Sequence, residues 1–284
     1  MKEAQVKVRV PATTANLGPG FDCLGVALKL YNNVVVTRKE NSLFPMAQES
    51  ADILFKTSKK KPFPFSISIR GDVPISRGLG SSVTLRAGVI TGLNRLMGEP
   101  LSQAECLNLV IQLEGHPDNA APAFLGGFTV ATEETILRVP VLSRLKFVVL
   151  IPEIKIETEK ARKVLPKKLT FQDAVRNEKQ AALVAAAFAS QKYELLANAF
   201  EDRLHQPYRK KFLPMLNEVI QAGVKEGALG GFLSGSGSAI VCLVLDAQIK
   251  RVAKAMEKVA SHYSVPNYTR SLTADNEGIK VSNY

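Results

Sequence analysis

The sequence has few of the residues on which disulfide and zinc sites depend. Among 284 residues there are three cysteines, three histidines and no tryptophan. Cys23, Cys106 and Cys242 lie far apart and no Cys-x-x-Cys pair is present, which argues against a disulfide framework and a structural zinc site. Separated, odd-numbered cysteines are typical of reduced thiols, so we expect a cytoplasmic protein.

Segments that would direct a chain to a membrane are also missing. No hydrophobic run approaches the ~20 residues of a membrane-spanning helix. The first residues, Met1–Lys7, are polar and lead straight into a strand pattern. We therefore expect neither a signal peptide nor a membrane partner.

The best-known nucleotide-binding motifs are absent. There is no Gly-x-x-x-x-Gly-Lys-[Ser/Thr], so a P-loop is unsupported. Gly78-x-Gly80 is followed by Val83 where the dinucleotide fingerprint has glycine or alanine, which argues against a Rossmann site. The protein-kinase signature set is missing as well.

Positive charge is in excess, with 37 Lys and Arg against 26 Asp and Glu and a net charge of +11. Nucleic acid is the partner that such an excess first suggests. The basic residues are nevertheless spread out, apart from short clusters such as Lys59–Lys61, and aromatic residues make up only 7%. Because stacking platforms are scarce, we favour a basic surface that helps anionic ligands, with no nucleic-acid partner.

Hydrophobic patterning predicts strands and helices that mix without strict alternation, which favours an α+β fold over a doubly wound sheet. We place a domain boundary near residue 150, giving domains 1–150 and 151–284, and we predict a variable loop over 40–64. The predicted strands are 5–10, 28–37, 65–70, 128–131, 146–151, 239–245 and 268–273. The predicted helices are 82–97, 103–114, 159–164, 171–190, 192–201, 214–225 and 246–263.

The most informative stretch is residues 74–84, Pro-Ile-Ser-Arg-Gly-Leu-Gly-Ser-Ser-Val-Thr. Gly78 and Gly80 allow backbone conformations closed to other residues and let a ligand approach. A helix that begins directly after such a turn presents free N–H groups and a positive dipole end, which suit phosphate. Taken alone, the stretch is equally compatible with an ordinary loop-to-helix junction.

Three other stretches are rich in glycine and small polar residues. They are 11–22 (Pro-Ala-Thr-Thr-Ala-Asn-Leu-Gly-Pro-Gly-Phe-Asp), 114–119 (Glu-Gly-His-Pro-Asp-Asn) and 233–238 (Leu-Ser-Gly-Ser-Gly-Ser). Function gathers on loops that rigid elements hold in place. Four such stretches in one chain therefore indicate a ligand site rather than four unrelated turns.

Together the four stretches resemble the GHMP kinase family (galacto-, homoserine, mevalonate and phosphomevalonate kinases). Residues 74–82 match its phosphate loop and 233–237 its C-terminal glycine-rich motif. Within the family, residues 11–25 and 114–123 are most similar to the homoserine kinases, as are Thr158-x-x-x-Arg162 and Pro207-x-Arg209. The resemblance covers nearly the whole chain. It implies the GHMP kinase fold: an N-terminal domain like domain 2 of ribosomal protein S5 and a C-terminal ferredoxin-like α/β sandwich.

The resemblance also implies an activity, the ATP-dependent phosphorylation of the side-chain hydroxyl of L-homoserine to O-phospho-L-homoserine, in threonine biosynthesis. ATP and Mg²⁺ are the implied cofactors, and family analogy implies a homodimer. Two alternatives stay open: a GHMP kinase for another small hydroxylated acceptor, and a non-catalytic protein of this fold that binds nucleotide or nucleic acid.

Phosphoryl transfer requires cradled phosphates, neutralised charge and an acceptor held in line. Magnesium prefers oxygen ligands and keeps several waters, so one carboxylate and one hydroxyl suffice. We expect Glu114 and Ser82 to supply them, although a surface helix position is the alternative for Glu114. The expected cofactor-binding residues are Pro74, Ile75, Ser76, Arg77, Gly78, Leu79, Gly80, Ser81, Ser82, Val83 and Thr84.

Homoserine is a zwitterion, so its carboxylate calls for arginine and its ammonium for an acid. By resemblance, Arg162 and Arg209 bind the carboxylate and Asp22 the ammonium. Each of these residues could instead have a structural role. The other expected substrate-binding residues are Asn16, His116, Asp118, Asn119, Thr158 and Gly235.

The expected catalytic residues are Asn119, Thr158 and Arg162, which would act by positioning and electrostatics. No strong general base is expected, and Asp118 is the candidate that would contradict this expectation. The chain departs from the family pattern at two places. Val83 to Arg86 stand where small alanines are usual, and Ser238 replaces the usual proline.

Overall fold

The computed structural model describes residues 5–39 and 44–283. Its first sheet has the strand order β10-β1-β2-β4-β5, and β3 pairs with a further part of β2. Long alternating runs of valine form the central strands because one face is buried, as the burial of Val34 and Val36 shows. The strands are β1 (Gln5–Ala15), β2 (Leu24–Thr37), β3 (Ser66–Gly71), β4 (Phe128–Ala131), β5 (Ile136–Val139) and β10 (Lys280–Asn283).

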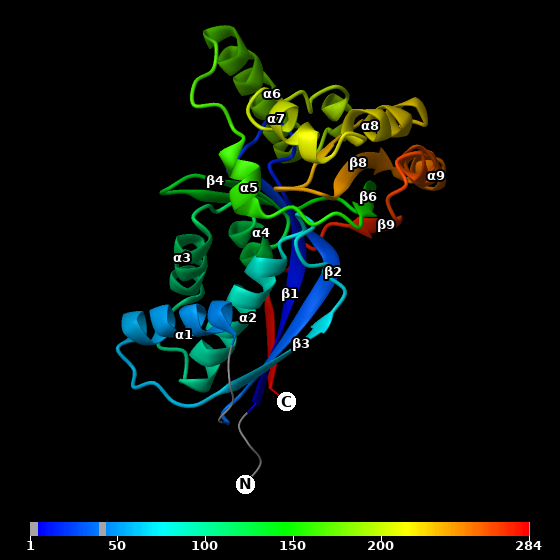
Figure 1. The fold of residues 1–284 in the computed structure, drawn as a ribbon. Coiled ribbons are helices and arrows are strands. Elements are labelled where there is room, and N and C mark those ends of the chain that lie inside the picture. Colours follow the sequence, from blue (N-terminus) through cyan, green and yellow to red (C-terminus); the bar gives the residue numbers. More distant parts are fainter. Residues whose placement is uncertain (1–4, 40–43, 284) are drawn as a thin grey trace.

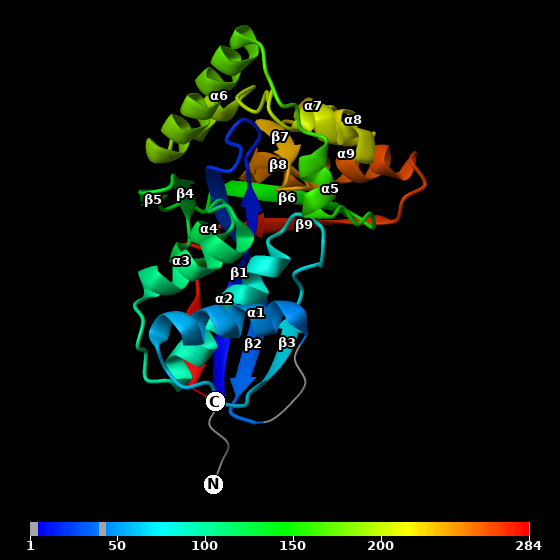
Figure 2. The ribbon, with the colours of Figure 1, turned by 60° about the vertical axis from the view of Figure 1, so that its left-hand side comes forward.

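Four helices accompany this sheet (Figures 1 and 2): α1 (Pro45–Ser58), α2 (Ser81–Leu96), α3 (Gln103–Glu114) and α4 (Ala120–Leu125). Helix α2 lies close against β2 because Gly88 and Gly92 face the valines of that strand. A Cβ on Gly88 would come within 2.4 Å of Val34. The distance and orientation of α2 relative to the sheet are therefore fixed. This packing also fixes the position of the turn that precedes α2.

The second sheet has the order β7-β8-β6-β9 and is antiparallel throughout. Successive residues of β8 alternate between two cores. Ile240 and Cys242 pack with α8 and α9, whereas Val241 and Leu243 join a core that continues into the first sheet. The elements are β6 (Leu145–Pro152), β7 (Gly230–Leu233), β8 (Ile240–Leu245), β9 (Asn267–Thr273), α8 (Leu216–Lys225) and α9 (Ile249–Ser261).

The shared core also includes α6 (Phe171–Ala189), whose Phe188 ring stacks on Phe128 of β4 at 4.3 Å between centroids. The shorter helices α5 (Thr158–Lys163) and α7 (Gln206–Arg209) lie with α6 in the upper half of the view, above α1–α4 (Figure 1). Because apolar contacts are continuous between the two sheets, loops from both meet along one boundary.

The predicted α+β fold is confirmed, with helices α2 and α3 near their predicted bounds and the capping box of Ser102 and Glu105 present. Two predictions are wrong. Residues 45–58 form α1 instead of a loop, and 192–201 contain only a 3-10 turn at Tyr193–Leu196. The patterning also missed α4, α7, β5, β7 and β10.

The domain boundary near residue 150 stays a prediction. The second sheet begins with β6 at Leu145, and β10 near the end of the sequence pairs with β1 in the first sheet. Within the described part of the chain, no helix is long and apolar enough to cross a membrane.

Candidate active site

A cavity of about 660 Å³ lies where the loops of the two sheets meet. All four glycine-rich stretches contribute to its wall. The predicted site residues that line it are Asn16, Asp22, Ile75, Ser76, Gly78, Gly80, Ser81, Ser82, Glu114, His116, Asp118, Asn119, Thr158, Arg162, Arg209 and Gly235. The structure thus gathers into one space residues up to 219 positions apart, while their individual roles stay predictions.

The turn before α2 is fixed by two glycines in left-handed backbone conformations, Gly78 at φ 74° and Gly80 at φ 70°. A Cβ on Gly78 would lie 2.0 Å from the carbonyl oxygen of Ser234, and one on Gly80 would lie 2.1 Å from Oγ1 of Thr13. Ser234 also donates a 2.6 Å hydrogen bond to the carbonyl of Gly78. The phosphate loop is therefore packed against the C-terminal glycine-rich stretch, which leaves no room for a side chain.

Helix α2 begins at Ser81, so the N–H groups of its first turn have no partner within the helix and lie at its positive end. Five of the eleven predicted loop residues do not line the cavity. Leu79, Val83 and Thr84 are buried beneath it, and Pro74 and Arg77 lie outside its wall. The side chains of the three buried residues therefore do not contact a ligand in the cavity.

A carboxylate–hydroxyl pair lies beside this helix start. The hydroxyl of Ser82 donates to Oε2 of Glu114 at 2.9 Å. Oε1 of Glu114 accepts from Nε of Arg86 at 2.9 Å, and Nη2 of Arg86 reaches Glu49 of α1 at 3.1 Å. Glu114 is therefore a largely buried, ion-paired residue, with only 11% of its side chain exposed.

The residues Val83–Arg86, which depart from the family pattern, lie in two different environments. Val83 and Leu85 pack into the core of the first sheet, whereas Arg86 fixes the Glu114 carboxylate. The third guanidinium nitrogen of Arg86, Nη1, is buried without a hydrogen-bond partner among the described residues. Sequence patterning did not assign this arginine to the site.

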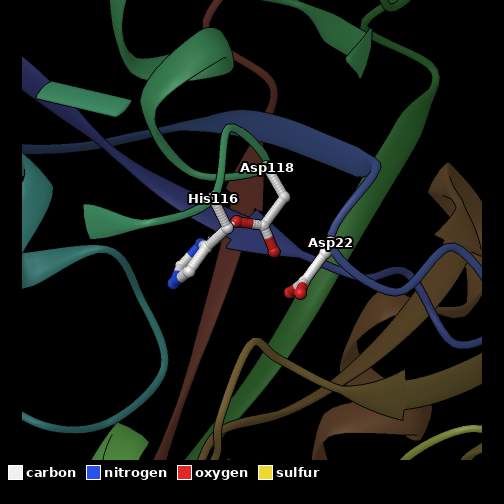
Figure 3. A group of neighbouring side chains, drawn as sticks. All are labelled: Asp22, His116 and Asp118. Carbon is white, nitrogen blue, oxygen red and sulfur yellow. Dashed lines mark hydrogen bonds and ion pairs between the residues drawn. The ribbon is translucent and has the colours of Figure 1, made fainter. Parts of the chain in front are cut away.

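The other end of the cavity carries charged side chains. Asp22 accepts two hydrogen bonds from Arg162, at 2.8 and 2.9 Å, although 140 residues separate them. Figure 3 shows Asp118 directed toward Asp22, with His116 beside it, and one oxygen or nitrogen of each lies within 4.8 Å of the others. Asp22 comes from the β1–β2 loop, and His116 and Asp118 come from the α3–α4 loop.

The pKa of His116 is raised, although burial on its own would lower it. Its Nδ1 lies 2.6 Å from Oδ1 of Asp118, and this hydrogen bond and the charge of Asp118 favour the imidazolium more strongly than burial disfavours it. Arg162 opposes the shift and Asp22 adds to it.

Arg209 is buried and belongs to the same end. Its Nη1 donates to the carbonyl of Gly235 at 2.9 Å, and its Nε donates to the carbonyl of Ala161 at 3.2 Å. Burial, together with the nearby charge of Arg162, lowers the pKa of Arg209 to about 10. The ring of Phe21 lies 5.2 Å from the Arg209 guanidinium and 5.4 Å from that of Arg162, so it supports both.

The remaining predicted polar residues also have neighbours in the cavity wall. Asn119 accepts from the hydroxyl of Thr13 at 2.7 Å. Asn16 donates to the carbonyl of Gly235 at 3.0 Å, and Thr158 is 3.5 Å from Ser236. These contacts fix the two amides, and among the described residues the Thr158 hydroxyl has only this long, weak contact.

Sequence reasoning missed an apolar wall of the cavity, made by Phe44, Met46, Ile69, Val73 and Leu85. Phe44 and Met46 come from the segment predicted to be a loop. A signal was present, because Pro45 suits a first helical position and Ala47, Ala51 and Leu54 follow with helical spacing.

The chain is similar in sequence to known proteins over nearly its whole length. The family model of the GHMP kinases N terminal domain matches residues 45–127, and that of the GHMP kinases C terminal matches residues 183–262. The homoserine kinase of Caldicellulosiruptor bescii is 39% identical over 97% of this chain and 96% of its own length. The homoserine kinase of Clostridium beijerinckii is also 39% identical, over 97% and 98%.

Solved structures show the same architecture. The crystal structure of homoserine kinase from Cytophaga hutchinsonii superposes with a TM-score of 0.90 over 99% of this chain and 98% of that one, at 24% identity. At this identity the likeness concerns the fold.

Proposed function

Since the chain belongs to the GHMP kinase family and, within it, to the homoserine kinases, we infer that it transfers the γ-phosphoryl group of ATP to the side-chain hydroxyl of L-homoserine. The product would be O-phospho-L-homoserine, which places the enzyme in threonine biosynthesis. The observation that carries the proposal is the cavity itself. The free N-terminus of α2 lies at one end, and Asp22, Arg162 and Arg209 converge at the other.

The phosphates of ATP would bind at the N-terminus of α2. The first main-chain N–H groups there have no partner within the helix, and Gly78 and Gly80 keep the approach free of side chains. The adenine base would lie on the apolar wall that includes Phe44, Met46 and Leu85.

Magnesium would be held by Ser82 and Glu114. Both groups present hard oxygen atoms to the cavity, and Arg86 engages Oε1 of Glu114 but leaves Oε2 to the Ser82 side. When bound, the ion would neutralise charge on the β- and γ-phosphates. Arg86 would keep the carboxylate from swinging away and would also reduce the negative charge that the site offers to a cation.

L-Homoserine would bind between Asp22 and the two arginines, with its ammonium toward Asp22 and its carboxylate toward Arg162 and Arg209. In the structure, Asp22 and Arg162 neutralise each other through two hydrogen bonds. A zwitterion can replace both halves of that pair at once, whereas a ligand with one charge would leave the other partner unpaired. The same contacts would discriminate against acceptors that lack either charge.

The acceptor hydroxyl would be held in line by Asn119 and Thr158, with Asn16 and Gly235 shaping the wall around it. Its oxygen forms a bond to the γ-phosphorus as the bond to the β–γ bridging oxygen breaks, and ADP leaves. Asp118 accepts from His116 and from Asn119 through the same oxygen, Oδ1, which holds the carboxylate in place. By family resemblance we assign the hydroxyl proton to a phosphate oxygen, and catalysis to positioning and electrostatics.

All three cysteines are free in the structure, which supports a reducing compartment and hence the cytoplasm. A homodimer is expected by family analogy, and sedimentation would measure it.

The test uses purified protein with Mg-ATP and a panel of acceptors: L-homoserine, L-serine, mevalonate, shikimate and galactose. ADP release and the phosphorylated product are measured together. We expect stimulation by L-homoserine well above that by the others. Absence of stimulation by L-homoserine would refute the proposal, and preference for another acceptor would leave a GHMP kinase with a different substrate.

A further inference from the structure

His205 is a buried histidine for which the reaction described above has no use. Its side chain has no exposed surface, and it lies at the start of α7, one turn before Arg209. Its Nε2 is 2.8 Å from the carbonyl oxygen of Gly18 in the β1–β2 loop. Its Nδ1 is 3.3 Å from Nη1 of Arg209.

These neighbours determine which nitrogen carries the proton. A carbonyl oxygen can only accept, so Nε2 must donate to Gly18, and the carboxylate of Asp202 at 3.4 Å is an acceptor on the same side. A guanidinium can only donate, so Nδ1 must accept from Arg209. His205 is therefore a neutral imidazole with its proton on Nε2.

The two contacts of His205 complete a closed set of hydrogen bonds around the acceptor end of the cavity, which is the end that Asp22, Arg162 and Arg209 form. Arg209 donates to the carbonyl of Gly235, and the same carbonyl accepts from Asn16. Asn16 in turn accepts from the main-chain N–H of Asp22 at 3.0 Å. The loop that carries Asp22 is thus connected to Arg209 twice, through Gly235 on one side and through His205 on the other.

The loop is also packed in place at this point. A Cβ on Gly18, which has φ 74°, would lie 2.8 Å from the carbonyl oxygen of Phe200. The ring of Phe21 stacks on the imidazole of His205 at 5.3 Å between centroids. Since Phe21 also lies against Arg162 and Arg209, the imidazole supports the aromatic surface on which both guanidinium groups rest.

We propose that His205 is a positioning residue for the acceptor substrate: through Nδ1 it orients Arg209, and through Nε2–H it holds the loop that presents Asp22. The proposal rests on the proposed function, because it assigns Arg209 and Asp22 to the two charges of homoserine. It predicts that His205 governs the binding of the zwitterion and leaves the binding of ATP unchanged.

Two substitutions separate the two contacts. In His205→Gln the side-chain amide nitrogen can reach the position of Nε2, which keeps the donor to Gly18 and removes the acceptor for Arg209. In His205→Asn the amide oxygen can take the position of Nδ1, which keeps the acceptor and removes the link to Gly18. The exposed His262 at the end of α9 offers the matched control His262→Gln.

Steady-state kinetics with L-homoserine and Mg-ATP are measured for each variant. We expect the KM for homoserine to rise about tenfold in His205→Gln, which is the size of one lost hydrogen bond to a charged group, and to rise less in His205→Asn. The KM for ATP should stay within about twofold of wild type in both, and the control should match wild type. Equal effects of both variants on the two substrates, or no effect on homoserine, would show that His205 is only structural.

A second measurement needs no substitution and no activity. The ¹⁵N shifts of the imidazole nitrogens of His205 in the wild-type protein report its tautomer. Protonation at Nε2 alone is expected, and a proton on Nδ1 would contradict the proposal even if neither variant folds. If the wild type fails to phosphorylate homoserine, the proposed function falls, whereas loss of the proposal alone would appear as an active enzyme whose His205 variants bind homoserine normally.

Discussion

The two ends of the cavity bind charge by different means. At the phosphate end, main-chain N–H groups and one helix dipole lie within a single stretch, and two glycines keep side chains away. At the acceptor end, Asp22, His116, Asp118, Arg162 and Arg209 come from four separate segments and are held by partly or fully buried hydrogen bonds. The first end depends on the close packing of its backbone against Thr13 and the C-terminal glycine-rich stretch. The second depends on the relative placement of the two sheets.

The largest effect should come from a side chain at the phosphate loop. In Gly78→Ala the new Cβ would meet the Ser234 carbonyl at 2.0 Å, in a backbone conformation with φ 74°. We expect the kcat/KM for ATP to fall by at least about 100-fold, because the loop must leave the backbone conformation in which its N–H groups would bind the phosphates. Gly98→Ala is the control, since Gly98 has φ 79° but nothing within 4 Å. Equal loss of ATP binding in the two variants would show that the effect of Gly78→Ala does not come from its contact with Ser234.

The next effect should be confined to the acceptor end. Arg162→Met removes the partner of Asp22 and one arginine of the carboxylate site. We expect the KM for homoserine to rise roughly 10- to 100-fold with the KM for ATP nearly unchanged. Arg162→Lys keeps the charge but not the bidentate geometry and should lie between Met and wild type. A matching rise in the KM for ATP would show that the two ends are not separable.

A smaller effect at the phosphate end concerns Glu114. Glu114→Gln should raise the half-saturating Mg²⁺ concentration about tenfold, because one ligand charge is lost. Glu49→Gln is the matched control, since Glu49 also pairs with Arg86 but is 57% exposed and does not line the cavity. The shift of the thermal midpoint by Mg-ADP gives a readout that is independent of turnover. Equal behaviour of the two variants would argue that Glu114 acts only through Arg86.

The smallest effect is a pH response, and it belongs to the acceptor end, because the phosphate loop contains no histidine. Burial, with the charge of Arg209, lowers the pKa of His205 despite Asp202, Asp22 and the Gly18 carbonyl, which raise it. The unfolded chain then binds more protons than the native one, so stability falls as the pH drops below about 6.5. Urea unfolding of His205→Asn across pH 5–7 should show a shallower loss than wild type.

His116 should act with the opposite sign. Its pKa is raised, so the stability that it contributes is present below about pH 6.5 and is lost as the pH rises through its native pKa. Urea unfolding should show that His116→Asn is less stable than wild type at acidic pH. At alkaline pH the stability of the variant should approach that of wild type. Responses of the same sign for the two histidines would contradict the contacts assigned to them.

The two ends also differed in how far the sequence could predict them. The turn, the start of α2 and the capping box of α3 are local, so glycine spacing and side-chain types were enough. The Asp22–Arg162 pair joins residues 140 positions apart, and no spacing rule connects them, so only the family resemblance brought them together. Arg86 was noticed as unusual, but its contact with Glu114 depends on how α2 and α3 pack.

The helices and strands that the sequence did not predict were missed for similar reasons. Strand β7 begins Gly-Gly and has little intrinsic strand preference, so its pairing with β8 decides its conformation. Residues 192–201 have helical composition, yet burial of Tyr193 and Leu196 in the shared core limits them to a single turn. In both places tertiary contacts outweigh local preference.

The pairing of β10 with β1 has a consequence for how the chain is made. Strand β1 contains residues 5–15, and the strand that covers its outer edge contains residues 280–283, so β10 is synthesised only after the other described strands and helices. Before β10 has paired with β1, this edge of the first sheet offers unpaired main-chain groups to any neighbouring chain. A nascent or interrupted chain would therefore hold the parts of its phosphate site while still exposing an open strand, which is the form most prone to associate with another copy or to be bound by a chaperone.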